Sequence, residues 1–122
     1  MIKLIICVTR RSDLTREQFQ DYWLNKHAPL YMKHADRYRT KKYLQCHTID
    51  TPLNDAIRES RGMGPAYDGV AEVWFESEQD FIEAMGTPEG QELSEMLLAD
   101  EANFLDHAKC SAFVTQEHEF PS

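Results

Sequence analysis

The chain has 122 residues, enough for one compact domain over residues 1–122, and 42% of them are apolar, which argues against a disordered protein. The 13 basic and 21 acidic residues give a net charge of −8, without a cluster of Lys and Arg to offset it. A surface this acidic repels phosphate backbones, so we exclude nucleic acid as a partner.

The first half of the chain opens with a strand and a helix. Residues 2–9 (IKLIICVT) form a short run dominated by β-branched residues, which predicts the strand. Thr15 and Gln18 have the spacing of a capping box, which predicts that a helix begins after Thr15. Pro29 disfavours the helical conformation of the preceding residue, so we expect the helix to end or bend there and residues 30–39 to add a further turn or two. One helical face carries residues at the spacing of successive turns: Phe19, Tyr22, Trp23, Lys26 and His27.

Two further strands flank an irregular stretch. Residues 41–50 alternate in polarity and predict the second strand, while residues 68–75 (DGVAEVWF) give the clearest third strand. The stretch between them, residues 51–65, is rich in Pro, Gly and charge. Its length predicts a functional or mobile loop.

The last part of the chain predicts two helices and a strand. Ser77 caps the second helix, Thr87 and Pro88 begin the third, and residues 108–116 form the last strand. The order is therefore β-α-β-β-α-β. We predict an α+β protein with the ferredoxin-like split βαβ arrangement, in which a four-stranded antiparallel sheet has helices on one face.

Targeting signals and a disulfide framework are both missing from the pattern. The first apolar run, residues 4–8, is shorter than the core of a signal peptide and far shorter than a membrane helix, so we expect a cytoplasmic protein without a membrane partner. Cys7, Cys46 and Cys110 are an odd number without CxxC spacing, which is typical of reduced thiols. Each falls in a predicted strand, and we interpret them as buried structural residues.

Apolar residues occupy both faces of the predicted sheet. The first strand points Ile5 and Cys7 away from the face that carries Ile2, Leu4, Ile6 and Val8. The third points Val70 and Trp74 away from Ala71, Val73 and Phe75. An open face should be polar in a monomer. We therefore predict a homodimer that packs sheet against sheet around a two-fold axis and closes into a barrel. The alternative is that the 51–65 loop or the third helix covers the second face.

His27 is the first candidate for chemistry, because imidazole titrates near neutral pH and His27 ends an amphipathic helix beside a proline. The alternative is a half-buried histidine that bonds a backbone carbonyl. His47 shares one face of the second strand with Tyr43 and Gln45, which indicates either a lined cavity or an exposed face.

The acids and the remaining motifs are less informative. Asp68 precedes a glycine in ordinary turn chemistry, and Asp100 could cap a short helix ending near Phe104, although either acid could orient a histidine. No cluster of His and Cys has ligand spacing, so we expect no metal site. No nucleophile elbow, phosphate loop or dinucleotide fingerprint occurs, so we expect no nucleotide cofactor either.

Four segments together resemble the EthD domain family of dimeric α/β-barrel proteins: residues 17–30 (EQFQDYWLNKHAPL), 42–47 (KYLQCH), 67–77 (YDGVAEVWFES) and 100–118 (DEANFLDHAKCSAFVTQEH). The resemblance spans nearly the whole chain, and the 51–65 loop matches least. It implies a ferredoxin-like homodimer with a pocket between sheet and helices. The family's helix histidine falls on His27, its strand histidine on His47, and its acids on Asp68 and Asp100.

The family's chemistry is varied. Members include proteins associated with ethyl tert-butyl ether degradation and fungal polyketide enzymes that look like decarboxylases or dehydratases. Relatives on the same barrel include cofactor-free monooxygenases and muconolactone-type isomerases. The methylmuconolactone isomerases are similar in pairing the helix histidine with a cysteine in the third strand. This chain has Val73 there, which argues against that route.

We therefore expect an oxidoreductase or lyase that acts on a small cyclic, aromatic or polyketide-like substrate by decarboxylation, dehydration or monooxygenation, without a metal or nucleotide cofactor. In this hypothesis His27 moves a proton, and aromatic side chains bind a flat ligand: Trp23, Tyr43, Tyr67, Trp74 and Phe104. The alternative is a non-catalytic protein that binds a small organic ligand for a partner oxygenase. A third possibility is a haem-binding relative with His27 or His47 as axial ligand.

Overall fold

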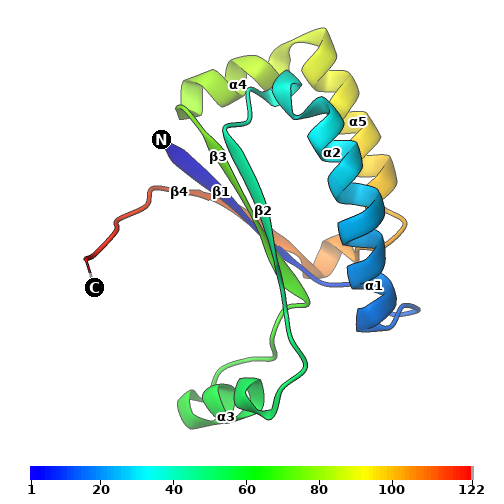
Figure 1. Ribbon diagram of the computed structural model, residues 1–122, viewed down its shortest axis with the longest axis vertical. Coiled ribbons are helices and arrows are strands. Elements are labelled where there is room, and N and C mark those ends of the chain that lie inside the picture. Colours follow the sequence, from blue (N-terminus) through cyan, green and yellow to red (C-terminus); the bar gives the residue numbers. More distant parts are fainter. Residues whose placement is uncertain (122) are drawn as a thin grey trace.

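The computed structural model describes residues 1–121 and has the predicted order of strands and helices, with one helix between the second and third strands that was not predicted (Figure 1). The four strands are β1 (Ile2–Val8), β2 (Lys42–His47), β3 (Gly69–Phe75) and β4 (Ser111–Thr115). The α-helices are α1 (Arg16–Tyr22), α2 (Ala28–His34), α3 (Pro52–Arg61), α4 (Glu78–Gly86) and α5 (Pro88–Glu101). Three short turns join them: the π-helical turn η1 (Trp23–His27) and the 3₁₀ turns η2 (Ala35–Tyr38) and η3 (His107–Lys109).

The strands pair in the order β2-β3-β1-β4, and every neighbouring pair is antiparallel. This is the ferredoxin-like α+β fold that the sequence predicts. Helices α1, α2 and α5 lie along one face of the sheet (Figure 1). The register places Ile2, Leu4, Ile6 and Val8 on the face toward the helices, as the alternation indicates.

The first helix does not end at Pro29, which was one of the two predicted outcomes, and residues 30–39 do add further helical turns. It begins with the predicted capping box at Thr15, but the backbone continues from α1 through η1 into α2. The amide of Ala28 donates to the carbonyl of Trp23, five residues back, so the register shifts before the proline. Pro29 then stands in the first turn of α2, directly after the wider turn. His27 is the last residue of this wider turn.

The segment 51–65 is not an irregular loop, because most of it forms helix α3. Thr51 caps this helix by accepting from the amide of Leu53, and Pro52 takes its first position. Gly62 ends it with a φ of 63°, in the left-handed region that glycine adopts without strain. The helix stands apart from the helical layer, beyond the far ends of β2 and β3 (Figure 1).

The cysteines are free but are not the buried residues that we predicted. Cys46 is exposed, and Cys7 and Cys110 are only half-buried. Cys110 precedes β4 instead of lying in it, because turn η3 occupies the start of the predicted 108–116 strand.

The core divides into two clusters beneath the helices. One cluster is built on Tyr31, Tyr38, Val73, Phe75, Leu93 and Leu97. The other is built on Val8, Phe19, Trp23, Ala71, Phe104 and Leu105. Tyr43 packs against both clusters, so it stands where they meet.

The opposite face of the sheet carries apolar residues from all four strands. The register places there Ile5, Leu44, Cys46, Val70, Trp74 and Phe113, together with the ion pair between Lys3 and Glu72. The helices of the layer are on the other side (Figure 1), so the described chain does not supply the alternative cover that we considered, α3 or the third helix.

Candidate functional site

His27 and Asp100 are in contact, although 73 residues separate them in the chain. The Nδ1 atom of His27 lies 2.8 Å from Oδ2 of Asp100, and both side chains are largely buried, with 10% and 17% of their surface exposed. Because the carboxylate only accepts, Nδ1 carries the hydrogen and Nε2 is left as the unprotonated nitrogen of the neutral ring. Among residues 1–121, no protein group hydrogen-bonds to this Nε2. Asp100 lies inside α5 and is not the helix cap that we considered.

A tyrosine and an asparagine extend this pair. The hydroxyl of Tyr22 donates to Oδ1 of Asp100 at 2.6 Å, and Nδ2 of Asn103 donates to the Tyr22 oxygen at 3.1 Å. The hydrogen bond to Asp100, and then burial, raise the pKa of Tyr22, so this hydroxyl remains a donor at neutral pH. Both carboxylate oxygens of Asp100 are therefore engaged, one by His27 and one by Tyr22.

A cavity of about 420 Å³ lies between the sheet and the helices, and His27 is part of its wall. This volume is within the range of small-molecule sites. Its walls are mostly aliphatic and aromatic, including Leu4, Ile6, Trp23, Val73, Leu97 and Phe104. The ring of Phe104 lies 5.0 Å from that of His27. At the side of β4 the wall is formed by His107, Cys110, Ser111 and Ala112, where no helix covers the strand.

The polar side chains on the predicted face of β2 form a second chain of hydrogen bonds. Nε2 of Gln45 donates to the Trp23 carbonyl at 3.0 Å and to the Tyr43 hydroxyl at 2.7 Å. Oε1 of Gln45 accepts from Nε2 of His47 at 2.7 Å. Tyr43 lines the cavity, whereas His47 lies outside it, with its ring 4.6 Å from that of Trp23. Burial lowers the pKa of His47, which favours its neutral form.

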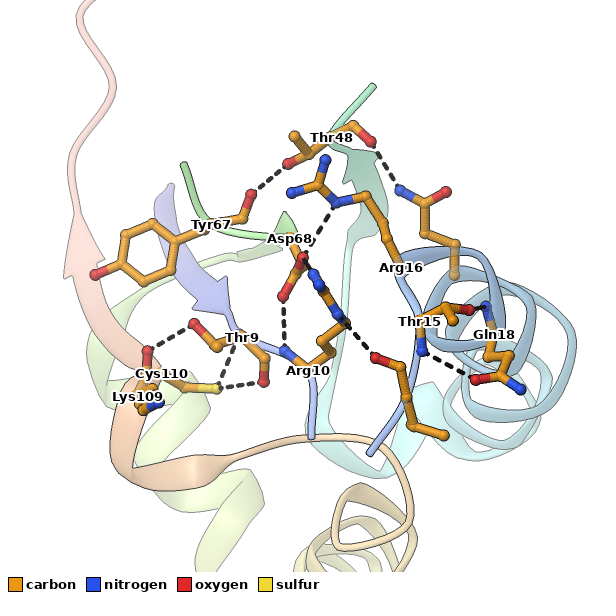
Figure 2. Close-up of polar contacts among 12 residues, drawn as sticks. Thr9, Arg10, Thr15, Arg16, Gln18, Thr48, Tyr67, Asp68, Lys109 and Cys110 are labelled. Atoms are coloured by element: carbon orange, nitrogen blue, oxygen red, sulfur yellow. Dashed lines mark hydrogen bonds and ion pairs between the residues drawn. The ribbon is translucent and has the colours of Figure 1, made fainter. Parts of the chain in front are cut away.

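Asp68 does not orient a histidine. It is buried at the start of β3, where it accepts from the Arg10 amide at 2.8 Å, from the Arg10 guanidinium and from Nε of Arg16 at 3.1 Å (Figure 2). Beside it, Thr48 donates to the Tyr67 carbonyl. This cluster ties β3 to the end of β1 and the start of α1. Asp68 is therefore a structural anchor that two arginines hold, and it is not the partner of a histidine that we considered from the sequence.

Two of the aromatic residues that were predicted to bind the ligand lie away from the cavity. The Tyr67 side chain is 41% exposed and points away from Asp68 in Figure 2. Trp74 lies on the opposite face of the sheet, between the ammonium groups of Lys3 and Lys42 and hydrogen-bonded to Glu117. Among the predicted aromatic residues, the cavity wall contains Trp23, Tyr43 and Phe104.

The structure adds wall residues that the sequence interpretation did not include. Tyr31 and Tyr38 line the cavity, and their hydroxyls bond to Thr40 and Ser94. Tyr31 is four residues after His27, so helical periodicity would have found it if the helix had been extended through Pro29. No comparable signal marks Glu101 and His107, which line the cavity 3.0 Å apart. Burial raises the pKa of Tyr31 to about 12 and also raises the pKa of Tyr43.

Among residues 1–121, no group of three or more His, Cys, Asp or Glu side chains is arranged to hold a metal ion. None of the described helices combines the length and the apolar character that crossing a bilayer requires.

The fold and this cavity define a class, the ferredoxin-like α+β proteins with a pocket between sheet and helices. Within that class the family is shown by sequence, because residues 11–108 match the model of the EthD domain. The chain belongs to the EthD domain family, as its resemblance implied. A search of curated proteins finds no match to this sequence.

Solved structures share the fold at low sequence identity. An EthD family protein of Bacillus halodurans has a TM-score of 0.63 and 20% identity, covering 97% of this chain and 99% of its own. A hydroxynitrile lyase of Passiflora edulis has a TM-score of 0.62 and 14% identity, covering 98% and 96%. A dimeric protein of unknown function with a ferredoxin-like fold, from Bacteroides fragilis, has a TM-score of 0.56 and 11% identity, covering 95% of each chain.

Proposed function

We propose that the protein is an enzyme that moves a proton on a small cyclic or aromatic molecule, with His27 as its general acid–base group. One observation carries the proposal: His27 binds a buried carboxylate through Nδ1 while forming part of the wall of an apolar cavity. An imidazole held in this way is oriented and has a fixed tautomer. Its Nε2 is then free to accept a proton from a bound molecule.

Asp100 has two tasks in this proposal. It keeps the hydrogen of the neutral ring on Nδ1, and it stabilises the imidazolium that forms when Nε2 accepts the substrate proton. Tyr22 and Asn103 hold the carboxylate in place. Proton transfer by one such group contributes about 10²–10⁴-fold, so the substrate itself must be readily ionised. Phenols, ketones with acidic C–H bonds and lactones meet that requirement.

Tyr43 is the group that we propose as hydrogen-bond donor to the substrate oxygen. Its own oxygen accepts from Gln45, and within residues 1–121 its hydroxyl hydrogen has no protein acceptor. Burial raises the pKa of Tyr43, so the hydroxyl stays protonated and can donate to an oxygen that becomes negative during proton transfer. In this proposal His47 is a positioning residue that acts on Tyr43 through Gln45.

The experiment follows base-catalysed exchange on a defined probe. 2-Tetralone, a two-ring ketone with acidic C–H bonds, is incubated with the protein in deuterated buffer, and exchange is followed by proton NMR. We expect His27→Gln to lose at least 100-fold in exchange rate and to keep the affinity for the probe. His34→Gln is the matched control, since His34 lies on α2 and is not part of the cavity wall. Binding without His27-dependent exchange would favour the alternative, an accessory protein that carries a ligand for a partner oxygenase.

We also propose that the protein is a homodimer with the two sheets face to face. The support is the outer sheet face, where Ile5 and Phe113 are paired neighbours and Val70 lies two positions from the β3 partner of Ile5, and where no described helix of the layer packs. A second copy would remove this surface from water, at about 25 cal/mol for each Å² of apolar area. The Bacteroides fragilis protein with the same fold is described as dimeric.

A further inference from the structure

We infer that the molecule bound in the His27 cavity carries no net charge. The inference deepens the proposed function and rests on it for the identity of the site. It also separates the reactions that the fold leaves open, because a substrate of decarboxylation enters as a carboxylate, whereas a phenol or a ketone enters neutral.

The first argument is the set of charged groups in the wall. Of the described residues that form it, none is a lysine or an arginine. The groups able to carry a positive charge are the imidazoles of His27 and His107. Each of them is already next to a carboxylate, His27 at 2.8 Å from Asp100 and His107 at 3.0 Å from Glu101. A protonated imidazole in either pair is therefore neutralised by protein before a ligand arrives.

The second argument is the charge balance of the reaction. When Nε2 of His27 takes a proton from a neutral substrate, the C–H or O–H bond breaks and its electron pair stays on the substrate. The substrate becomes an anion, His27 becomes a cation, and Asp100 stays an anion, so the total charge of −1 does not change. A substrate that was already anionic would hold two negative charges close to Asp100, inside an apolar wall that screens them poorly.

The third argument excludes a cationic substrate. Its partners would have to be the carboxylates at the site. Asp100 already accepts from His27 and Tyr22, and Glu101 is engaged by His107. The remaining wall is uncharged: it consists of hydrocarbon and aromatic side chains with Ser94, Cys110 and Ser111, and two of its tyrosine hydroxyls bond to Thr40 and Ser94. Such walls favour a flat, uncharged molecule of about two or three rings for the cavity of about 420 Å³.

The test compares three probes that share one ring system: 2-naphthol, 2-naphthoate and 2-naphthylmethylammonium. Their affinities for the wild-type protein are measured by isothermal titration calorimetry at about pH 7, where the first is neutral and the others are charged. We expect 2-naphthol to bind at least tenfold more tightly than either ion. Equal or tighter binding of an ion, or no binding of 2-naphthol, would overturn the inference.

A gain of function makes the test sharper. Leu98 lines the cavity but is 61% exposed, so a longer side chain can be placed there without disturbing the core. Leu98→Arg should raise the affinity for 2-naphthoate at least fivefold relative to the affinity for 2-naphthol. Leu98→Gln, which is polar but uncharged, is the control and should leave this ratio of affinities at its wild-type value. If His27→Gln keeps both the exchange rate of 2-tetralone and the preference for 2-naphthol, the proposed catalytic role fails and the inference about charge stands.

Discussion

Replacing Asp100 by Asn tests how the site fixes the proton on His27. The substitution keeps the shape of the side chain but gives it one acceptor oxygen and one NH₂ donor. Tyr22 determines whether the amide oxygen or the NH₂ group points toward His27, because the Tyr22 hydroxyl already accepts from Asn103 and donates its hydrogen toward residue 100. The amide oxygen must therefore face Tyr22, and the NH₂ group must face Nδ1 of His27.

That orientation forces the imidazole into the other tautomer. Nδ1 would have to accept from the NH₂ group, so the ring hydrogen would move to Nε2, the nitrogen that we propose as the proton acceptor. A protonated Nε2 cannot accept a substrate proton. We expect Asp100→Asn to lose about 10²–10⁴-fold in 2-tetralone exchange, the contribution of one general base. The lost charge-assisted hydrogen bond, about 1.5–3 kcal/mol, accounts for about 10–150-fold of this.

The assay pairs the exchange rate with a spectroscopic reading of the tautomer. Nitrogen-15 NMR of the labelled ring separates the Nδ1–H from the Nε2–H form and needs no substrate. Removing the tyrosine hydroxyl in Asp100→Asn/Tyr22→Phe frees the amide to rotate, and we expect the Nδ1–H tautomer and part of the exchange rate to return. If Asp100→Asn keeps both the Nδ1–H tautomer and the wild-type rate, the reasoning about this pair is wrong.

Three other predictions address stability and assembly. Because burial raises the pKa of Tyr31 to about 12 from about 10, the folded state keeps this proton between those pH values while the unfolded chain loses it. Tyr31 should therefore lower the free energy of unfolding by about 2–3 kcal/mol as the pH rises through that window, measured by urea denaturation. Tyr31→Phe should make the total fall smaller by this amount, while Tyr22, Tyr38 and Tyr43, whose pKa values are also raised, contribute the rest. Asp68→Asn should cost about 1–3 kcal/mol of stability in the same assay, since the arginine partners of Asp68 are partly exposed. The variant should keep the wild-type affinity for 2-naphthol. If a stable variant lost this affinity, the purely structural role of Asp68 would be contradicted. Ile5→Glu should convert the proposed dimer to a monomer, measured by sedimentation velocity. Ile82→Glu is the control, because Ile82 lies on the outside of α4 and is 50% exposed, and it should not change the dimer. A wild-type protein that sediments as a monomer would contradict the proposed dimer.

Local patterns in the sequence were sufficient for the order of the four strands and of the helices other than α3. Alternation over residues 2–9 and 68–75 predicts strands because side chains of a strand point to opposite faces, whatever the strand pairs with. The capping box at Thr15 is a contact between residues three apart, so it can be identified without the fold. His27 could be singled out for the same reason, from its place on the aromatic face of one helix.

Local rules failed where a distant part of the chain changed their outcome. The wider turn η1 lets the helix pass Pro29, and its Trp23 carbonyl is also held by Gln45 from β2. Composition indicated a loop over residues 51–65, because Pro and Gly are common in loops, but here they begin and end helix α3.

The partners of the acids were decided by tertiary structure alone. Sequence offered Asp68 and Asp100 equally as companions of a histidine. Packing of α5 against η1 brings Asp100 to Nδ1 of His27, whereas the turn before β3 places Asp68 between Arg10 and Arg16. Residues that are 52 to 73 positions apart meet only because the sheet and helices fold together, and no periodicity of the sequence encodes such a meeting. The sequence therefore determined which groups are available for chemistry, and the tertiary structure determined which of them share a site.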